Sequence, residues 1–219
     1  MKKKVKNQNN LDFYDHQEIG ELWCYDNFLI FYLFDFACHD IKHRKVPSYI
    51  KYISPYCFSD CKNIESIEFE ENSELISLGN NSFSNSSIEQ INIPENVKII
   101  DKYAFSYCTQ LKTINFTKNS KLEKIGEASF ISTGIECIEI PDLIIKIEEN
   151  TFNYCCNLQT VKFSTRSKLL EIEDRTFSYS SIRSINIPVN VKKIGQNAFE
   201  QCENLKIVTF PENSKLSEI

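Results

Sequence analysis

Hydrophobic residues recur along this 219-residue chain with a fixed period. Single phenylalanines close successive segments, and the spacing between them alternates between 25 and 22 residues, so that one full unit has 47 residues. These phenylalanines are Phe58, Phe83, Phe105, Phe130, Phe152, Phe177 and Phe199. A constant period of 20–50 residues is typical of a solenoid, a propeller or a similar array.

Each unit contains two unlike segments, here called first-type and second-type coils. Residues 108–130 (CTQLKTINFTKNSKLEKIGEASF) are a first-type coil, and residues 132–152 (STGIECIEIPDLIIKIEENTF) are a second-type coil. Each holds one I-x-F or I-x-I step, which indicates a short strand with one buried face. The apolar residues that follow lack the sustained spacing of a long helix. We therefore expect a return through one short turn of helix, a 3₁₀ turn or an irregular segment.

A β-propeller is the main alternative to a solenoid for such a period. A propeller blade needs four strands within about 40–50 residues, whereas each half of this unit repeats a single strand. One coil cannot bury its own apolar side chains, so its neighbours must present the same shape. The pattern predicts an α/β solenoid with a parallel β-sheet on its concave face and short helical or irregular returns.

The two ends of the chain depart from the regular pattern. Residues 41–219 form the predicted array, and residues 1–40 are interpreted as an N-terminal segment with a degenerate capping coil, because terminal repeats are usually atypical. Projecting the period backwards places four apolar residues on first-type positions: Leu22, Phe28, Phe31 and Phe36. The chain stops before the next expected phenylalanine. We therefore expect a C-terminally open array, either as a fragment or with an end that docks onto something.

The repeated sequence motif of the coils resembles that of a known family. KKIGQNAFEQCENLKIVTFPENSKLSEI (residues 192–219) and KIIDKYAFSYCTQLKTINF (residues 98–116) are similar to BspA-like leucine-rich repeats, whose hallmark is I-G-x-x-A-F-x-x-C-x-x-L followed by I-x-I-P. The hallmark glycine is replaced at Asp101, Glu148 and Glu173. The resemblance implies a right-handed leucine-rich-repeat coil and a non-enzymatic surface antigen or adhesin that binds proteins.

Composition and charge exclude several classes of partner. The formal net charge is -5, which argues against nucleic acid, because that binding depends on Lys and Arg neutralising phosphates. Polar residues follow the basic start MKKKVKNQNN where a signal peptide needs an apolar core. The most apolar stretch, residues 28–36, is interrupted by Asp35, and a membrane span needs about 20 apolar residues. We therefore predict no membrane insertion.

The chain has nine cysteines, a number that raises the question of a disulfide framework. Cys61, Cys108, Cys155 and Cys202 recur every 47 residues and so lie on alternate coils. Coils stacked at about 4.8 Å separate them by roughly 10 Å, whereas a disulfide needs Cα atoms within about 7 Å. We interpret them as small apolar residues that fill an inward slot, and an odd count without consistent pairing favours a reducing compartment.

The chain offers little material for catalysis. His39 and His43 have a spacing found in metal sites, but no C-x-x-C accompanies them. Beyond His43 there is no histidine to act as a general base, and G-x-S-x-G is absent. We therefore predict no enzymatic activity, no metal and no cofactor.

Outward-facing strand residues are the candidate site. The predicted central ladder is Lys45, Glu68, Asn92, Asn115, Glu139, Lys162, Asn186 and Thr209. Beside it lies a second ladder of His43, Ser66, Gln90, Thr113, Cys137, Thr160, Ser184 and Ile207. A polar sheet face without a pocket suits an extended protein partner more than a small ligand. The same residues would also be required for solubility alone.

Two functions remain open at this point. The family resemblance favours a surface antigen or adhesin, whereas the missing signal peptide and the expected unpaired cysteines favour an intracellular scaffold or regulatory adaptor. Self-association through the open C-terminal end is a further alternative. The sequence leaves the compartment and the identity of the protein partner open.

Overall fold

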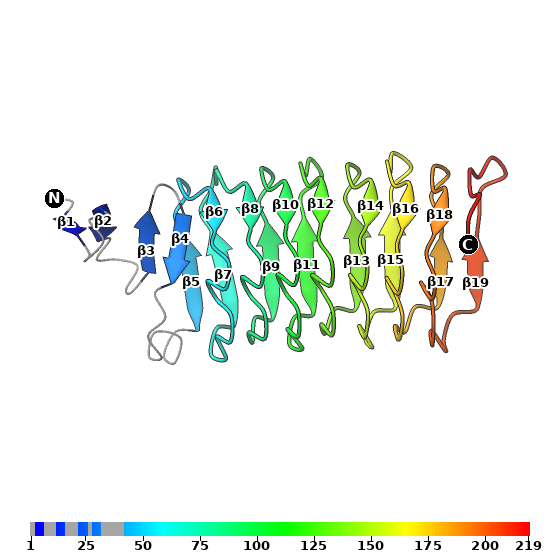
Figure 1. Ribbon diagram of the computed structural model, residues 1–219, viewed down its shortest axis with the longest axis horizontal. Helices are drawn as coiled ribbons and strands as arrows, with labels where there is room; N and C mark the ends of the chain where they lie inside the picture. Colours follow the sequence, from blue (N-terminus) through cyan, green and yellow to red (C-terminus); the bar gives the residue numbers. More distant parts are fainter. Residues whose placement is uncertain (1–2, 7–11, 16–21, 26–27, 32–41) are drawn as a thin grey trace.

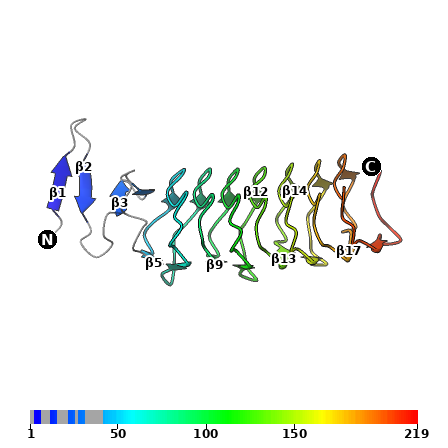
Figure 2. The same cartoon turned by 90° about the horizontal axis from the view of Figure 1, so that it is seen from below.

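The structure is a computed structural model that describes residues 42–219 throughout, together with the backbone of four short strands before them. These strands are β1 (Lys3–Lys6), β2 (Asp12–Asp15), β3 (Leu22–Tyr25) and β4 (Phe28–Phe31). From residue 42 onward the chain winds into a stack of coils that extends almost straight along one axis (Figures 1 and 2). The predicted solenoid is confirmed, although its strand sheet shows little concave curvature.

The I-x-F and I-x-I steps form the longer strands of the stack. All of them are parallel, and they make two four-stranded sheets instead of the single sheet that the pattern predicts. The first sheet comprises β5 (His43–Val46), β7 (Ser66–Phe69), β9 (Gln90–Ile93) and β11 (Thr113–Phe116). The second comprises β13 (Cys137–Ile140), β15 (Thr160–Phe163), β17 (Ser184–Asn186) and β19 (Ile207–Thr209).

A second line of strands runs along the opposite side of the stack (Figure 1). These strands have two residues each: β6 (Tyr52–Ile53), β8 (Ser77–Leu78), β10 (Ile99–Ile100), β12 (Lys124–Ile125), β14 (Lys146–Ile147), β16 (Glu171–Ile172) and β18 (Lys193–Ile194). They pair in parallel and join β4 through β6, so that β1 to β4 extend the same sheet to eleven strands.

Pairing between the longer strands alternates in strength. Each second-type strand pairs with the first-type strand that follows over three or four residues. In contrast, β7 pairs with the following β9 over two residues, β15 with β17 over one, and within residues 42–219 no pairing joins β11 to β13. Proline contributes to this asymmetry, because second-type strands lead into Pro47, Pro94, Pro141 and Pro188. Proline has no amide hydrogen to donate to the preceding coil.

The predicted helical returns are wrong, since residues 42–219 contain no helix. The residues two positions before and two positions after each stacked phenylalanine have positive φ, for example Tyr103 (φ 56°) and Tyr107 (φ 59°) around Phe105. Left-handed residues at this spacing interrupt the continuous right-handed backbone that a helix requires. The turn amides instead donate to the next coil, as from Phe105 N to Ser129 O (2.8 Å).

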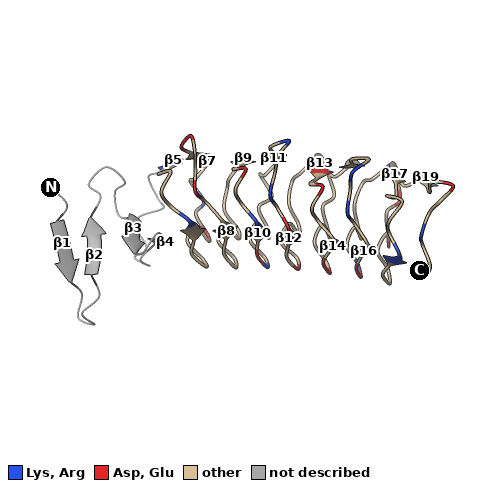
Figure 3. Ribbon diagram, turned by 90° about the horizontal axis from the view of Figure 1, so that it is seen from above, with Lys and Arg blue, Asp and Glu red and all other residues tan. Residues whose placement is uncertain are grey.

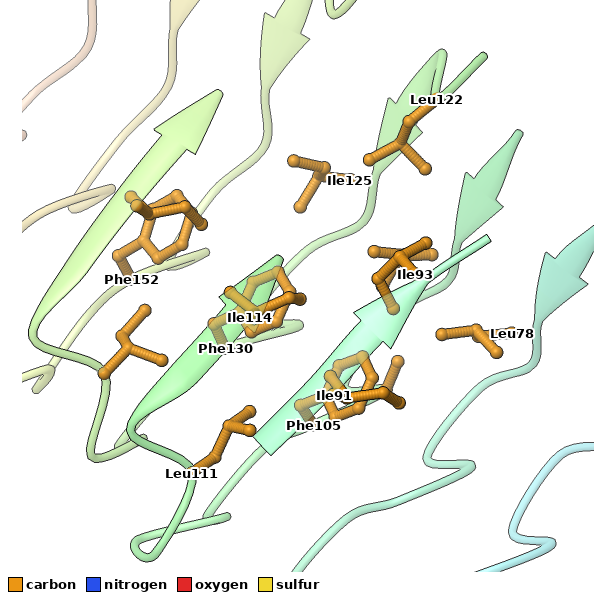
Figure 4. Packing of buried hydrophobic residues seen from close by; sticks show 14 of the residues in the cluster. Leu78, Ile91, Ile93, Phe105, Leu111, Ile114, Leu122, Ile125, Phe130 and Phe152 are labelled. Carbon is orange, nitrogen blue, oxygen red and sulfur yellow. The ribbon is translucent and has the colours of Figure 1, made fainter. Parts of the chain in front are cut away.

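One column of phenylalanines runs through the core of the array. Phe58, Phe83, Phe105, Phe130, Phe152 and Phe177 are fully buried, and successive rings, through to Phe199, stack with centroids 5.0–5.5 Å apart. Figure 4 shows Phe105, Phe130 and Phe152 alongside the inward isoleucines of β9 and β11. This confirms that the repeated apolar residues form one shared interior.

The cysteine column is more polar than predicted. Cys108, Cys155 and Cys202 are buried free thiols that do not pair with one another. Cys155 Sγ donates to Phe130 O (3.0 Å) and lies 3.2 Å from Thr133 Oγ1. Equivalent bonds join Cys108 to Phe83 O and Cys202 to Phe177 O. A buried thiol thus follows the phenylalanine that closes each second-type coil, and a buried hydroxyl of Ser86, Thr133 or Ser180 follows the phenylalanine that closes each first-type coil.

Cys61 differs from the other cysteines of the column, because it is disulfide-bonded. Its partner lies outside the residues whose side chains are described. The prediction that the four cysteines of the column do not pair with each other holds. Cys61 is buried in the apolar core as predicted (1% exposed), but the expectation that it is unpaired is wrong.

The backward projection of the repeat is also wrong in register. It placed Phe31 at the first-type position that Ile125 holds, whose neighbour in the next coil is Ile147. At the equivalent place in the structure, Leu29 and not Phe31 pairs with Ile53. Leu22 lies opposite Phe31 in an antiparallel pair instead of on the parallel strand sheet. Phe36 lies outside the described residues. The division at residue 40 and the capping role remain predictions.

Because the core is shared between coils, inward strand residues should contribute more to the free energy of unfolding than outward ones. Ile138 is 2% exposed, so Ile138→Ala should lower the free energy of unfolding by ~2–5 kcal/mol through cavity formation. Asn92→Ala, on the exposed face of β9, should change it by less than ~0.5 kcal/mol. Urea denaturation of both variants checks the assignment, and equal losses would contradict it.

The buried thiols predict a loss of stability at high pH. Burial raises the pKa of Cys108 to about 11 and that of Cys155 to about 12. An unfolded thiol ionises near pH ~8.5, so the unfolded chain loses these protons first. The stabilisation is fully present below that pH and is lost as pH rises towards the folded values. Above pH ~9, unfolding free energy should fall less steeply with pH in Cys108→Ser/Cys155→Ser than in the wild type. Identical slopes would show that the thiols do not contribute.

Candidate interaction surface

The central ladder lies in register along the two strand sheets. Lys45 is the register partner of Glu68, Asn92 that of Asn115, Glu139 that of Lys162, and Asn186 that of Thr209. All eight side chains are exposed. Together with the second ladder they form the surface that we call the strand face. The structure thus brings the predicted residues together, and their role in binding remains a prediction.

Neighbouring side chains on the strand face bond to one another across coils. Asn115 Nδ2 donates to Asn92 Oδ1 (2.8 Å), and Thr209 Oγ1 donates to Asn186 Oδ1. Within the second ladder, His43 Nδ1 lies 2.8 Å from Ser66 Oγ. The strand face is therefore an ordered polar surface. A partner that uses these amides must replace the bonds they already make.

Charges of both signs lie along the array (Figure 3). Many form ion pairs between adjacent coils, including Lys102 with Glu127 (2.8 Å) and Arg166 with Asp142 (2.8 Å). The hydrogen bond from Lys102 lowers the pKa of Glu127. Exposed ion pairs contribute little stability. These ion pairs do, however, partly neutralise the carboxylates, so that a paired carboxylate attracts a positively charged partner less strongly.

The prediction of a sheet face without a pocket is wrong over β7 and β9. A hollow of about 560 Å³ opens there, and the loops at residues 70–73 and 94–96 form its walls. It includes Glu68 and Asn92 of the central ladder and Ser66 and Gln90 of the second ladder. The hollow lies where pairing between a first-type and a second-type strand is short. Periodicity could not predict this hollow, because the spacing of residues does not reveal how far two loops separate.

Exposed tyrosines on the turns were also missed. Tyr56, Tyr103, Tyr107, Tyr154 and Tyr179 occupy left-handed backbone positions next to the phenylalanine column. Tyr154 and Tyr179 stack on each other, with ring centroids 4.4 Å apart. The signal was present in the repeat, since these tyrosines lie two residues before or after the buried phenylalanine.

The described part of the chain was expected to hold neither a metal site nor a membrane span. No group of three or more His, Cys, Asp or Glu side chains there is arranged to hold a metal ion. No helix among these residues is long and apolar enough to cross a membrane. His39, one of the two histidines with a spacing found in metal sites, lies outside the described residues. The surface offers recognition by hydrogen bonds and charge.

Stacked parallel strands with a periodic apolar core define a leucine-rich-repeat type of solenoid. The family model for the BspA type leucine rich repeat region matches six copies, over residues 30–159 and 123–219. The chain belongs to this family. A comparison with curated proteins finds no match.

Solved structures share this fold. The pneumococcal vaccine antigen PcpA is 21% identical with a TM-score of 0.61, and the match covers 84% of this chain and 55% of PcpA. A leucine rich cell surface protein from Faecalibacterium prausnitzii is 20% identical with a TM-score of 0.56, covering 96% and 52%. A leucine-rich-repeat protein from T. pallidum is 16% identical with a TM-score of 0.54, covering 94% and 78%. The chain therefore spans about half the length of the first two proteins.

Proposed function

We propose that this protein is a non-enzymatic protein-interaction module whose strand face binds an extended protein partner. The observation that carries the proposal is the series of exposed polar side chains from Lys45 to Thr209, which lie in register within four successive strand pairs. A rigid face of this kind contacts a partner at many points with little loss of conformational entropy. Repeat proteins of several families use such extended surfaces for binding.

The finer proposal is a surface antigen or adhesin. PcpA is a vaccine antigen and the Faecalibacterium prausnitzii protein is a cell surface protein. The disulfide at Cys61 supports an oxidising compartment. The alternative is an intracellular scaffold or regulatory adaptor, which the exposed free thiols of Cys137 and Cys156 favour.

Charge reversal on the strand face tests the binding proposal. Tagged wild-type chain and Glu68→Lys/Glu139→Lys are used to capture proteins, and the bound proteins are identified by mass spectrometry. A partner of the strand face should be captured by the wild type and lost, or reduced at least about tenfold, with the variant, because like charges across an interface oppose association.

The matched control is Glu200→Lys/Glu203→Lys, which changes two exposed carboxylates away from the strand face. It should capture the same partner as the wild type. Equal loss with both variants would indicate a general charge effect and would contradict binding through the strand face.

Surface labelling separates the adhesin from the scaffold. Intact and permeabilised cells that produce the chain are treated with a membrane-impermeant amine reagent. We expect labelling of the chain in intact cells. Labelling only after permeabilisation would remove the adhesin proposal and leave the adaptor.

Self-association through the C-terminal end remains part of this proposal.

A further inference from the structure

The hollow over β7 and β9 differs in charge from the rest of the strand face. Three glutamates line it, Glu68 from β7, Glu70 from the following loop and Glu95 from the opposite wall, and no Lys or Arg is among its lining residues. A concave site lined by charge of one sign concentrates its electric field and attracts the opposite charge.

These carboxylates are only partly neutralised. Glu68 is exposed, and its neighbour on the ladder, Lys45, forms no ion pair with it among the described residues. Glu70 Oε2 accepts the amide of Ser48 (3.0 Å), which leaves its charge in place. Glu95 has one distant partner, Lys121, at 3.9 Å. Since Glu68 and Glu70 form no ion pair among the described residues, the hollow keeps a net negative charge.

The repeat itself provides a comparison for these residues. One unit further along, the positions of Glu68, Glu70 and Glu95 are occupied by Asn115, Thr117 and Asp142; two units along, they are occupied by Lys162, Ser164 and Val189. Asp142 is paired with Arg166 at 2.8 Å. Stacking of the coils therefore does not require three carboxylates here, because the same fold forms without them.

We propose that this hollow is the part of the strand face that receives a Lys or Arg side chain from an extended segment of the protein partner. The segment would lie along the strand face, and its cation would enter between the two loops, where the carboxylates are grouped. Asn92 and Gln90 line the same hollow, and their side-chain oxygens can accept further hydrogen bonds from an ammonium or guanidinium group. Charge-assisted bonds of this kind are stronger than neutral ones.

The proposal rests on the strand face being a binding surface, and it specifies the chemistry of the partner there. It predicts attraction that depends on the position of the carboxylates and not only on the net charge of -5. It also predicts weakening by salt, since exposed charges are screened.

Two labelled peptides test the proposal on the full chain. Fluorescein-GGRGRGG and fluorescein-GGEGEGG are titrated with the protein at low and high salt, and binding is measured by fluorescence anisotropy. The wild type should bind the Arg peptide at least about tenfold more tightly than the Glu peptide at low salt. Glu68→Gln/Glu70→Gln/Glu95→Gln should lose most of this preference.

A second triple variant controls for net charge. Glu136→Gln/Glu200→Gln/Glu203→Gln removes the same amount of charge at exposed positions outside the hollow, and it should keep the wild-type preference. Circular dichroism of both variants checks that they remain folded. Equal weakening in both, or no preference in the wild type, would overturn the proposal.

A sign-reversed variant gives an independent readout. Glu68→Lys/Glu70→Lys/Glu95→Lys should prefer the Glu peptide over the Arg peptide, and an unchanged preference would overturn the proposal. The hollow variants at Glu68, Glu70 and Glu95 could bind the peptides as the wild type does while Glu68→Lys/Glu139→Lys still loses its captured partner. In that case the strand face binds without this cation site. If that capture variant also keeps its partner, the proposed function itself fails.

Discussion

Every other feature of this protein depends on the stacking of one coil on the next. A single coil has only a few buried apolar residues, and no coil encloses its own phenylalanine. The ring of Phe130 is covered by Phe105 on one side and Phe152 on the other, with centroids 5.3 and 5.4 Å away. The hydrophobic effect therefore stabilises the array only when neighbours are present on both sides. The exposed ladders have their regular spacing because the interior imposes it.

Backbone hydrogen bonds reinforce the same constraint. The turn that holds each phenylalanine sends its amides to the adjacent coil, and left-handed residues such as Tyr103 and Tyr107 orient them. Positive φ is uncommon for residues other than glycine, so each such turn has a local cost that the bonds between coils offset. A coil taken out of the stack would lose both its core and its hydrogen-bond partners.

Periodicity predicted the elements that depend on stacking and missed those that depend on local backbone geometry. Ile138 and Phe152 could be assigned to the interior because stacked coils must bury the same apolar positions in every unit. The helical returns were wrong because no residue type marks the left-handed positions, which hold Tyr, Asn, Ala, Ser and Arg alike. The hollow beside Glu68 was missed because it arises from the separation of two loops. The disulfide of Cys61 was missed because the repeat contains no second cysteine that could pair with it.

The alternation of long and short strand pairing divides the array into blocks of two coils. Each second-type strand is bound most extensively to the first-type strand that follows, as β13 is to β15, and pairing is absent between β11 and β13. Removing or inserting a single coil would place two strands of one type side by side and mismatch their small buried residues. Removing or inserting a whole block would restore the same junction. Such a protein can change its length in evolution by duplication or deletion of whole two-coil blocks, with breakpoints at the junctions where the least bonding is lost.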